Sequence, residues 1–138
     1  MSFVLDERLR KDCFDLGRGD LCRTLLMNDS RFPWLILVPE REDVTEIHQL
    51  AASDRAQLMR ESCKVGQALA REFGADKLNV AALGNVVSQL HVHHVVRYRS
   101  DCAWPRPIWC VGAPEPYDDD HLQRMLARLR TALPALRD

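Results

Sequence analysis

The chain has 138 residues, enough for one domain with a hydrophobic core but with little room for a second module. Its 19 Lys and Arg residues against 20 Asp and Glu give a formal net charge of -1, so no overall field attracts nucleic acid or an anionic membrane. The N-terminus lacks a basic head followed by an apolar segment, and no stretch approaches the length of a membrane span. We therefore expect a cytoplasmic protein without nucleic-acid or membrane partners, in which any affinity for phosphate is local.

The first half of the chain predicts a helix and then strands. Residues 6–16 carry apolar side chains at helical spacing and are followed by Gly17, which predicts a short helix that ends in a glycine cap. Residues 21–27 and 34–38 are strand-like, and turn-forming residues separate them. These patterns predict a helix followed by two neighbouring strands.

The second half predicts a long helix, two more strands and a final helix. Apolar residues recur at helical spacing over 54–73, before a glycine, which is typical of an amphipathic helix packed on a core. Residues 77–83 and 89–98 form an adjacent strand pair, and the aromatic segment 104–109 is expected to be an ordered loop that packs on the domain or across a dimer. Residues 118–133 begin with acidic residues and end with arginines, as the helix dipole favours. The order of elements predicts an α+β domain with a mostly antiparallel sheet.

Residues 89–96 hold the most informative pattern, because polar side chains alternate with aliphatic ones. On a strand, Gln89, His91 and His93 would share one face, about 6.7 Å apart from one to the next, while the aliphatic residues point into the core. His94 falls on the aliphatic face, which predicts a partly buried, hydrogen-bonded histidine or a β-bulge rather than a catalyst. The sequence thus presents two imidazoles and an amide in a row.

That row suits phosphoryl chemistry. A neutral imidazole attacks phosphorus well, and the resulting phosphoimidazole is reactive enough for water to hydrolyse it. A second polar group on the same face could hold the tautomer of His91 or protonate the leaving oxygen. Two alternatives remain: the histidines could lie on the surface of an edge strand, or His-x-His-His could be part of a zinc or iron site, although no carboxylate stands at ligand spacing.

Residues 79–97 resemble the signature of the histidine triad (HIT) nucleotide hydrolases and transferases, in which three histidines alternate with hydrophobic residues. Gln89 stands where the first histidine usually is, His91 matches the central one and His93 the last. Residues 28–39 resemble the nucleotide-pocket segment of the family, and Gln at the first position is similar to the bacterial diadenosine tetraphosphate hydrolase-like branch.

The resemblance implies a single HIT-like domain over 1–138, with its motifs within about 20–110 and a C-terminal helix at about 118–133. It implies a sheet of about five strands with a long helix and shorter N- and C-terminal helices. Two protomers of this fold commonly join into a dimer, so we expect a homodimer.

The function implied is hydrolysis of a phosphoanhydride or phosphoramidate bond in a nucleoside polyphosphate, such as a dinucleoside polyphosphate. By resemblance His91 is the nucleophile that becomes nucleotidylated, His93 contacts the phosphate and assists proton transfer, and Gln89 completes the catalytic set. We expect no cofactor, with Mg²⁺ only as a complex with the substrate. The alternatives are a nucleotidyl transferase or phosphorylase, a nucleotide-binding module with little turnover because Gln89 cannot ionise, and a His-ligated metalloprotein.

The candidate substrate-binding residues are Asn28, Phe32, Trp34, Asn79 and Arg97. By resemblance Asn79 lies at the ribose or phosphate, and Trp34 occupies a place where some relatives carry an additional histidine. Phe32 and Trp34 could stack on a base, and Arg97 could bind a distal phosphate. Each also has a structural alternative, as a turn or strand-edge asparagine, a core aromatic or a solvated arginine.

The five cysteines form no C-x-x-C pair, and their odd number argues against both a disulfide framework and a zinc ribbon. Several fall on apolar faces, where cysteine acts as a small hydrophobe. We expect reduced thiols, with a catalytic cysteine partnered by histidine as the less favoured alternative.

Overall fold

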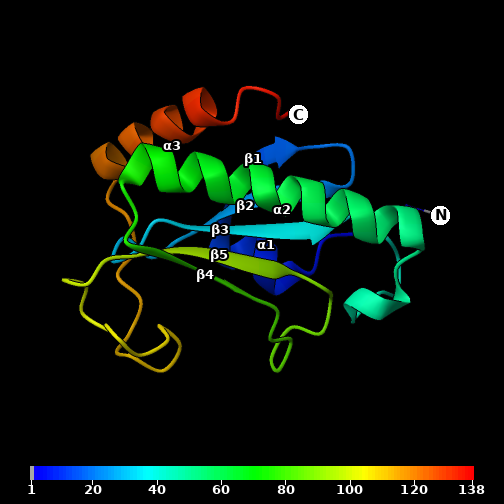
Figure 1. Ribbon diagram of the computed structural model, residues 1–138, viewed down its shortest axis with the longest axis horizontal. Coiled ribbons are helices and arrows are strands. Elements are labelled where there is room, and N and C mark those ends of the chain that lie inside the picture. The colour runs from blue at the N-terminus through cyan, green and yellow to red at the C-terminus, as the bar shows by residue number, and fades with distance from the viewer. Residues whose placement is uncertain (1) are drawn as a thin grey trace.

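A computed structural model describes residues 2–138 as a five-stranded sheet with helices on it (Figure 1). The elements in chain order are α1 (Glu7–Asp12), β1 (Cys13–Arg18), β2 (Cys22–Met27), β3 (Trp34–Pro39), the 3-10 helix η1 (Ile47–Gln49), α2 (Ala52–Phe73), β4 (Lys77–Ala81), β5 (Val92–Arg97) and α3 (Asp119–Ala132). The strand order is β1-β2-β3-β5-β4, and every neighbouring pair is antiparallel. The predicted α+β class is confirmed.

The long helix α2 lies along one face of the sheet, with α3 beside it (Figure 1). Its apolar stripe buries Leu58, Val65 and Leu69 against the side chains of β3 and β5 that point to this face. Full burial of such a side chain stabilises the fold by about 1.5–3 kcal/mol. Gly74 ends the helix in the left-handed conformation at φ 58°, so the predicted glycine cap is confirmed.

The opposite face of the sheet has its own core. It is covered by α1 and by the long segment between β5 and α3, which loops out on the side away from α2 (Figure 1). The buried residues of this second core are Leu9, Leu25, Phe32, Trp34, Ile36, Val38, Val95, Ala103 and Ile108. Both faces of the sheet are therefore buried, which is why β3 and β5 are buried along their whole length.

The predicted helix over 6–16 is wrong in its second half. The helix ends at Asp12, and Cys13–Arg18 form strand β1, which pairs with β2. Gly17 does not cap a helix: it lies in β1 at a shift of register, with φ 107°, and a Cβ there would collide with the carbonyl oxygen of Arg137. The backbone groups of Arg18 and Arg137 bond to each other at 2.6 and 2.9 Å, so the glycine admits the C-terminal segment beside β1.

The two strands predicted around the histidines are shorter than expected. The first ends at Ala81 instead of residue 83, and the second spans 92–97 instead of 89–98. Between them, the N–H of Leu90 donates to the carbonyl of Val44 at 2.9 Å, outside the sheet. Gln89 and His91 therefore precede β5 in a segment outside the sheet that is held by other contacts.

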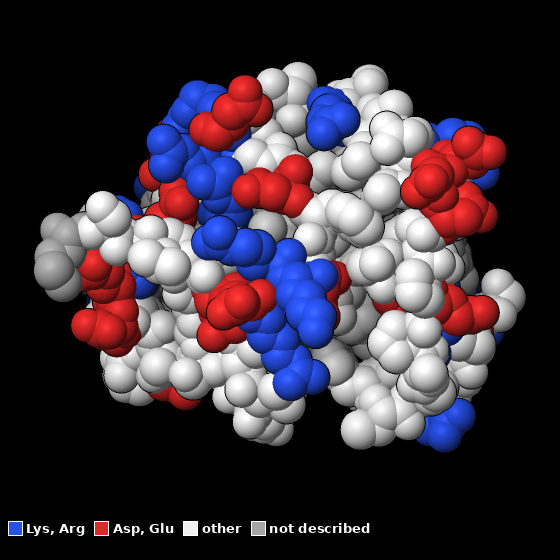
Figure 2. Space-filling model, turned by 180° about the vertical axis from the view of Figure 1, so that it is seen from behind, with Lys and Arg blue, Asp and Glu red and all other residues white. Residues whose placement is uncertain are grey.

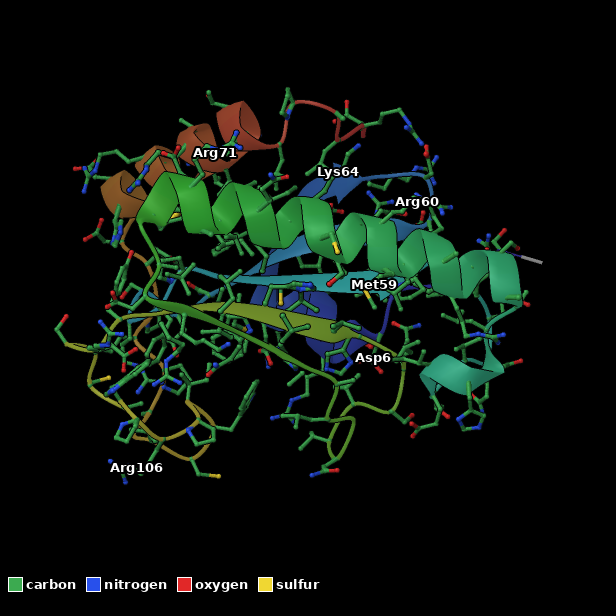
Figure 3. The ribbon with its side chains drawn as sticks, viewed as in Figure 1. Asp6, Met59, Arg60, Lys64, Arg71 and Arg106 are labelled. Atoms are coloured by element: carbon green, nitrogen blue, oxygen red, sulfur yellow. The ribbon has the colours of Figure 1, made fainter. Side chains whose placement is uncertain are left out.

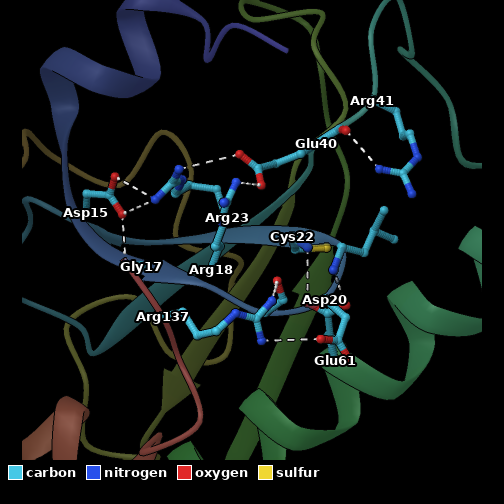
Figure 4. A network of polar contacts seen from close by, with 12 residues as sticks. Asp15, Gly17, Arg18, Asp20, Cys22, Arg23, Glu40, Arg41, Glu61 and Arg137 are labelled. Atoms are coloured by element: carbon cyan, nitrogen blue, oxygen red, sulfur yellow. Dashed lines mark hydrogen bonds and ion pairs between the residues drawn. The ribbon is translucent and has the colours of Figure 1, made fainter. Parts of the chain in front are cut away.

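Polar groups join the turn between β1 and β2 to α2 and to the end of β3 (Figure 4). The buried carboxylate of Glu61 on α2 accepts hydrogen bonds at 3.0 Å from the backbone N–H groups of Leu21 and Cys22. Arg23 lies between two carboxylates, those of Asp15 and Glu40. These contacts fix the hairpin against α2.

Charges of both signs are interleaved on the back of the molecule, next to a wide uncharged area (Figure 2). The Lys and Arg side chains form a band from the upper left to the lower centre of this view, with Asp and Glu side chains along both of its sides (Figure 2). No helix within residues 2–138 combines the length and the apolarity that a membrane span requires.

Candidate functional site

His91 and His93 lie side by side at the start of β5. Their ring centroids are 5.0 Å apart with 69° between the planes, and the residues are 7% and 6% exposed. His93 is paired with Ile36 of β3 and Ala81 of β4, so its side chain belongs to the second core's face of the sheet. The predicted alternation is thus present at these two histidines.

The hydrogen bond of His91 determines which ring nitrogen can react. Its Nδ1 lies 2.6 Å from the backbone carbonyl oxygen of Gln89. Because a carbonyl oxygen can only accept, Nδ1 must carry the hydrogen. In the neutral ring, Nε2 of His91 then has a free lone pair, as a nucleophile requires.

His93 is held in the opposite tautomer. The indole N–H of Trp34 donates to Nδ1 of His93 at 3.0 Å, and indole is a donor only. Nδ1 is therefore the acceptor, and the hydrogen of the neutral ring is on Nε2. Burial, followed by the nearby His91 and His94, lowers the pKa of His93 to about 3, so the ring is neutral near pH 7.

The two Nε2 atoms remain available to a ligand. Within residues 2–138, neither Nε2 atom has a hydrogen-bond partner. Only one side-chain N or O atom of these residues is both fully buried and without a partner, and it is Oη of Tyr117. The Nε2 atoms are therefore not sealed from solvent. One ring thus offers a lone pair, and the neighbouring ring, 5.0 Å away between centroids, offers an N–H donor.

Trp109, which is not among the predicted site residues, completes an aromatic group around His93. Its ring lies edge-on at 5.2 Å from His93 and 6.1 Å from Trp34, measured between centroids. It belongs to the segment 104–109, which was expected to pack aromatic surface on the domain or across a dimer. Packing on the domain is what the structure has, but no local pattern indicates that this tryptophan reaches the histidines.

A buried ion pair anchors the segment that carries Trp109. Arg97 Nε lies 2.8 Å from Asp101 Oδ2, with side chains 2% and 5% exposed. Burial alone would raise the pKa of Asp101, but hydrogen bonds from Arg97 and from the backbone N–H groups of Tyr98, Ala103 and Trp104 lower it to about 2. The carboxylate thus fixes the first turn of the segment.

Three predicted substrate-binding residues, Arg97, Asn79 and Phe32, lie in or against this anchor. Arg97 is only 1% exposed, and its Nη1 donates to Oδ1 of Asn79 at 2.7 Å. Its guanidinium stacks over the rings of Phe32 and Trp104, and Phe32 is itself 1% exposed. The predictions that Arg97 binds phosphate and that Phe32 stacks on a base are corrected, because neither side chain has a surface that a substrate can reach.

Asn28 and Trp34 also make structural contacts. Oδ1 of Asn28 accepts from the backbone N–H of Tyr117 at 2.9 Å, which ties the end of β2 to the segment before α3. Trp34 is 5% exposed, and its indole N–H donates a hydrogen bond to His93. Of the predicted substrate-binding set, Trp34 is the residue that the structure brings to the histidines, as a hydrogen-bond donor to a ring.

Gln89 acts on His91 through its backbone. Its side-chain oxygen accepts from the N–H of Asp6 at 2.9 Å, and its amide nitrogen donates to the carbonyl of Val4 at 2.9 Å. The side chain is therefore committed to the segment before α1. The carbonyl that fixes the tautomer of His91 belongs to the same residue, so this attachment also holds the carbonyl in place.

His94 points the other way, as predicted from the alternation. It is fully buried, its Nδ1 lies 3.1 Å from the carbonyl of Val92, and its Nε2 lies 2.7 Å from Oγ of Ser62 on α2. Burial lowers its pKa to about 4, although the bond to Val92 opposes this. Pairing with β3 and β4 continues in register through His94, so the predicted hydrogen-bonded histidine is confirmed and no bulge is needed.

Metal ligation was the alternative for these histidines. Over residues 2–138, no three His, Cys, Asp or Glu side chains converge in a way that could hold a metal ion.

Residues 8–100 match the HIT domain family. The chain is 44% identical to a histidine triad protein from Marinobacter aquaeolei, with a TM-score of 0.96 over 99% of this chain and 100% of that one. It is 43% identical to a histidine triad protein from Bradyrhizobium japonicum, with a TM-score of 0.93 over 96% and 98% of the two chains. A third histidine triad protein, from Sinorhizobium meliloti, is 44% identical, with a TM-score of 0.92 over 95% and 97%. None of the curated proteins matches the chain.

Proposed function

Because this chain belongs to the histidine triad family, whose members are generally nucleotide hydrolases or transferases, we propose that it hydrolyses a dinucleoside polyphosphate through a nucleotidyl intermediate on His91. The observation that carries the proposal is the pair of opposite tautomers. His91 offers a lone pair at Nε2, and His93 beside it offers an N–H at Nε2. An oxygen of one phosphate group can accept a hydrogen bond from His93 while Nε2 of His91 attacks the phosphorus.

In the first step, Nε2 of His91 attacks a phosphorus atom of the substrate, a P–N bond forms, and the P–O bond to the leaving phosphate breaks. In the second step, water attacks the same phosphorus, the P–N bond breaks, a proton of the water passes to solvent, and His91 returns to its starting state with the lone pair on Nε2. The N–H of His93 donates to the phosphate oxygens, where negative charge grows.

The tautomer of His93 bears on the leaving group. Its Nδ1 already accepts from Trp34, so losing the proton on Nε2 would leave an anionic ring. His93 is therefore a hydrogen-bond donor to phosphate and a poor proton donor to the leaving group, which narrows the proton-transfer role predicted from the sequence. This favours phosphoanhydrides, whose leaving phosphate needs no proton, over phosphoramidates, whose leaving amine does. The choice agrees with the diadenosine tetraphosphate hydrolase-like branch that the sequence resembles.

The test is to trap the intermediate. The protein is mixed with diadenosine tetraphosphate and Mg²⁺, quenched in base, and digested for mass spectrometry. We expect an adenylyl group on the peptide that contains His91, and turnover of diadenosine tetraphosphate that exceeds turnover of adenosine phosphoramidate. His48→Ala, which removes an exposed histidine of η1, is the matched control and should behave as the wild type.

Three results would redirect the proposal. Substrate binding without turnover would indicate a nucleotide-binding module. Capture of the adenylyl group by added inorganic phosphate would indicate a phosphorylase or transferase. Turnover with no adduct at His91 would rule out the covalent mechanism.

We further propose that the site needs no resident metal, since the neutral ring of His91, with its hydrogen on Nδ1, offers a lone pair at Nε2 without a metal. The p-nitrophenyl ester of AMP has a leaving group that needs neither a proton nor Mg²⁺ complexation. Its turnover should be unchanged after dialysis against a strong chelator. Activity that is lost on dialysis and restored by zinc or iron would favour the metalloprotein alternative.

We also propose that two copies join through β4. This strand is at the edge of the sheet, and exposed apolar side chains lie on it and just after it, at Val80, Leu83 and Val86. Light scattering should give the mass of a dimer, and Val80→Lys should shift it toward the monomer. A monomeric wild type at micromolar concentration would contradict this proposal.

A further inference from the structure

A cavity of about 790 Å³ lies on the side of the sheet that α2 covers. Its walls are α2, the turn between β1 and β2, and the C-terminal segment 131–137. The volume is within the range of small-molecule sites. His91, His93, Trp34 and Trp109 are not among its lining residues, so it is separate from the site described above.

The C-terminal segment forms the outer wall because it is tied back to the sheet. The backbone of Arg137 bonds to Arg18 of β1, and its side chain bonds to the carbonyl of Gly19 and pairs with Asp20 (Figure 4). The segment from the end of α3 to this anchor therefore spans the space above α2.

The acidic groups around the cavity already have partners. Asp20 pairs with Arg137 at 3.3 Å, and Glu72 pairs with Arg128 at 2.9 Å. Glu61 accepts from two backbone N–H groups and from Gln57. Asp20 and Glu72 are therefore each paired with an arginine, whereas Glu61 is held by uncharged donors.

Two cationic side chains of α2 that line the cavity have no hydrogen-bond or ion-pair partner within residues 2–138. Figure 3 shows Arg60, Lys64 and Arg71 on the side of α2 that faces the C-terminal segment, and all three line the cavity. Arg60 donates to the side-chain oxygen of Gln57, whereas Lys64 and Arg71 have no hydrogen bond or ion pair with any residue from 2 to 138. They are seven residues apart, about 10 Å along the helix, so their long side chains can meet at one anion.

The rest of the lining is largely aliphatic. Val65 and Ala68 of α2 and Leu37 of β3 line the inner side, and Leu133 and Leu136 line the C-terminal wall. No aromatic side chain is part of the lining, so a nucleobase would find nothing to stack on. An aliphatic chain fits this surface better than a nucleotide does.

We propose that this cavity binds an anionic amphiphile, with its head group between Lys64 and Arg71 and its aliphatic chain against Val65, Ala68 and the leucines of the C-terminal segment. The shared chemistry is one anionic head on one alkyl chain. A fatty-acid carboxylate and an alkyl phosphate both satisfy it.

The test titrates the full-length protein with dodecanoate, dodecyl phosphate and dodecanol, each below its aggregation concentration. Calorimetry gives affinity, and amide NMR gives location. We expect one site per chain, with shifts at Lys64, Ala68 and Leu136 and none at His93. Lys64→Gln/Arg71→Gln should weaken binding of the anions by about fivefold to tenfold and leave dodecanol unaffected. The matched control, Lys11→Gln/Arg106→Gln, removes one exposed Lys and one exposed Arg elsewhere and should bind as the wild type.

A second variant tests the chain site independently of charge. Ala68→Phe fills the cavity and should reduce binding of both anions, with folding checked by thermal unfolding. The stronger of the two anions identifies the head group. Equal binding by the Gln pair and its control would overturn the proposal, as would dodecanol binding as tightly as dodecanoate. It would also be overturned by ligand shifts at the histidines, or by lining residues that shift on dimer formation but not with any of the three ligands.

Discussion

His93 and His94 are adjacent in β5 and nearly equally buried, yet they belong to different regions of the molecule. His93 faces Trp34 and Trp109, and one of its ring nitrogens remains free. His94 faces α2, and both of its ring nitrogens are hydrogen-bonded, to Ser62 and Val92. We call the face of the sheet that carries His93 the reactive face and the face that carries His94 the structural face. Burial lowers the pKa of both rings, so a perturbed pKa does not distinguish the two faces. The number of ring nitrogens without a hydrogen-bond partner distinguishes them.

The largest expected loss of turnover comes from removing the nucleophile on the reactive face. His91→Ala should lower the turnover of diadenosine tetraphosphate by about 10⁴-fold or more, because no other group takes over covalent catalysis. Affinity for AMP, measured by calorimetry, should change far less. A variant that retains near-normal turnover would remove the proposed mechanism.

His93→Ala should lower turnover by about 10²- to 10³-fold, the usual loss for one hydrogen-bond donor to a charged transition state.

Trp34→Phe keeps an aromatic ring at this position but removes the N–H that fixes the tautomer of His93. It should lower turnover by about tenfold and raise the pKa of His93. Turnover and ¹⁵N chemical shifts of the imidazole measure the two effects. If Trp34→Phe leaves both unchanged, the hydrogen bond has no functional role.

On the structural face, His94 should make the fold sensitive to acid. Its pKa is lowered from 6.5 to about 4 on folding, so between these values the unfolded chain binds more protons. Stability is therefore complete above about pH 6.5 and declines as the pH falls toward 4, by about 3 kcal/mol from this group. His93 adds to the same trend. Urea unfolding at pH 7.5 and 4.5 measures the loss, and His94→Gln should reduce it; an equal loss in the variant would assign the acid sensitivity elsewhere.

Ser62→Ala should separate the two faces most cleanly. It leaves Nε2 of His94 without a partner and should cost about 1–3 kcal/mol in the free energy of unfolding. Turnover should stay within about twofold, because nothing on the reactive face moves. A loss of turnover comparable to that of Trp34→Phe would show that the two faces are coupled.

The smallest effect concerns Gln89, whose side chain is bonded to Asp6 and Val4. Gln89→His adds an ionisable ring but should add no step to the pH profile of kcat/KM, since position 89 acts on His91 through its backbone carbonyl. A new titrating step would indicate that this side chain does reach the substrate, as the family resemblance predicts.

Local periodicity is enough to predict the elements that are long or that alternate strictly between polar and apolar residues. The apolar stripe and terminal glycine of α2, and the acidic start of α3, were predicted to within about two residues of their observed bounds. The alternation around His93 and His94 predicts that those two rings lie on opposite faces of the sheet, and the structure confirms it. The predicted helix over 6–16 failed because Phe14 and Leu16 fit a strand as well as a helix, and pairing of Cys13–Arg18 with β2 decided between them.

The sequence by itself determined the family resemblance, the order of the histidines and the face that each one takes, because these depend on residues next to one another. Only the tertiary structure decided which nitrogen of His93 is free, since its partner Trp34 is 59 residues away. It likewise decided that Arg97 is a buried anchor and that Trp109 stands beside the histidines. Tautomer and exposure are set by groups that long-range strand pairing brings together, and no local pattern encodes that pairing.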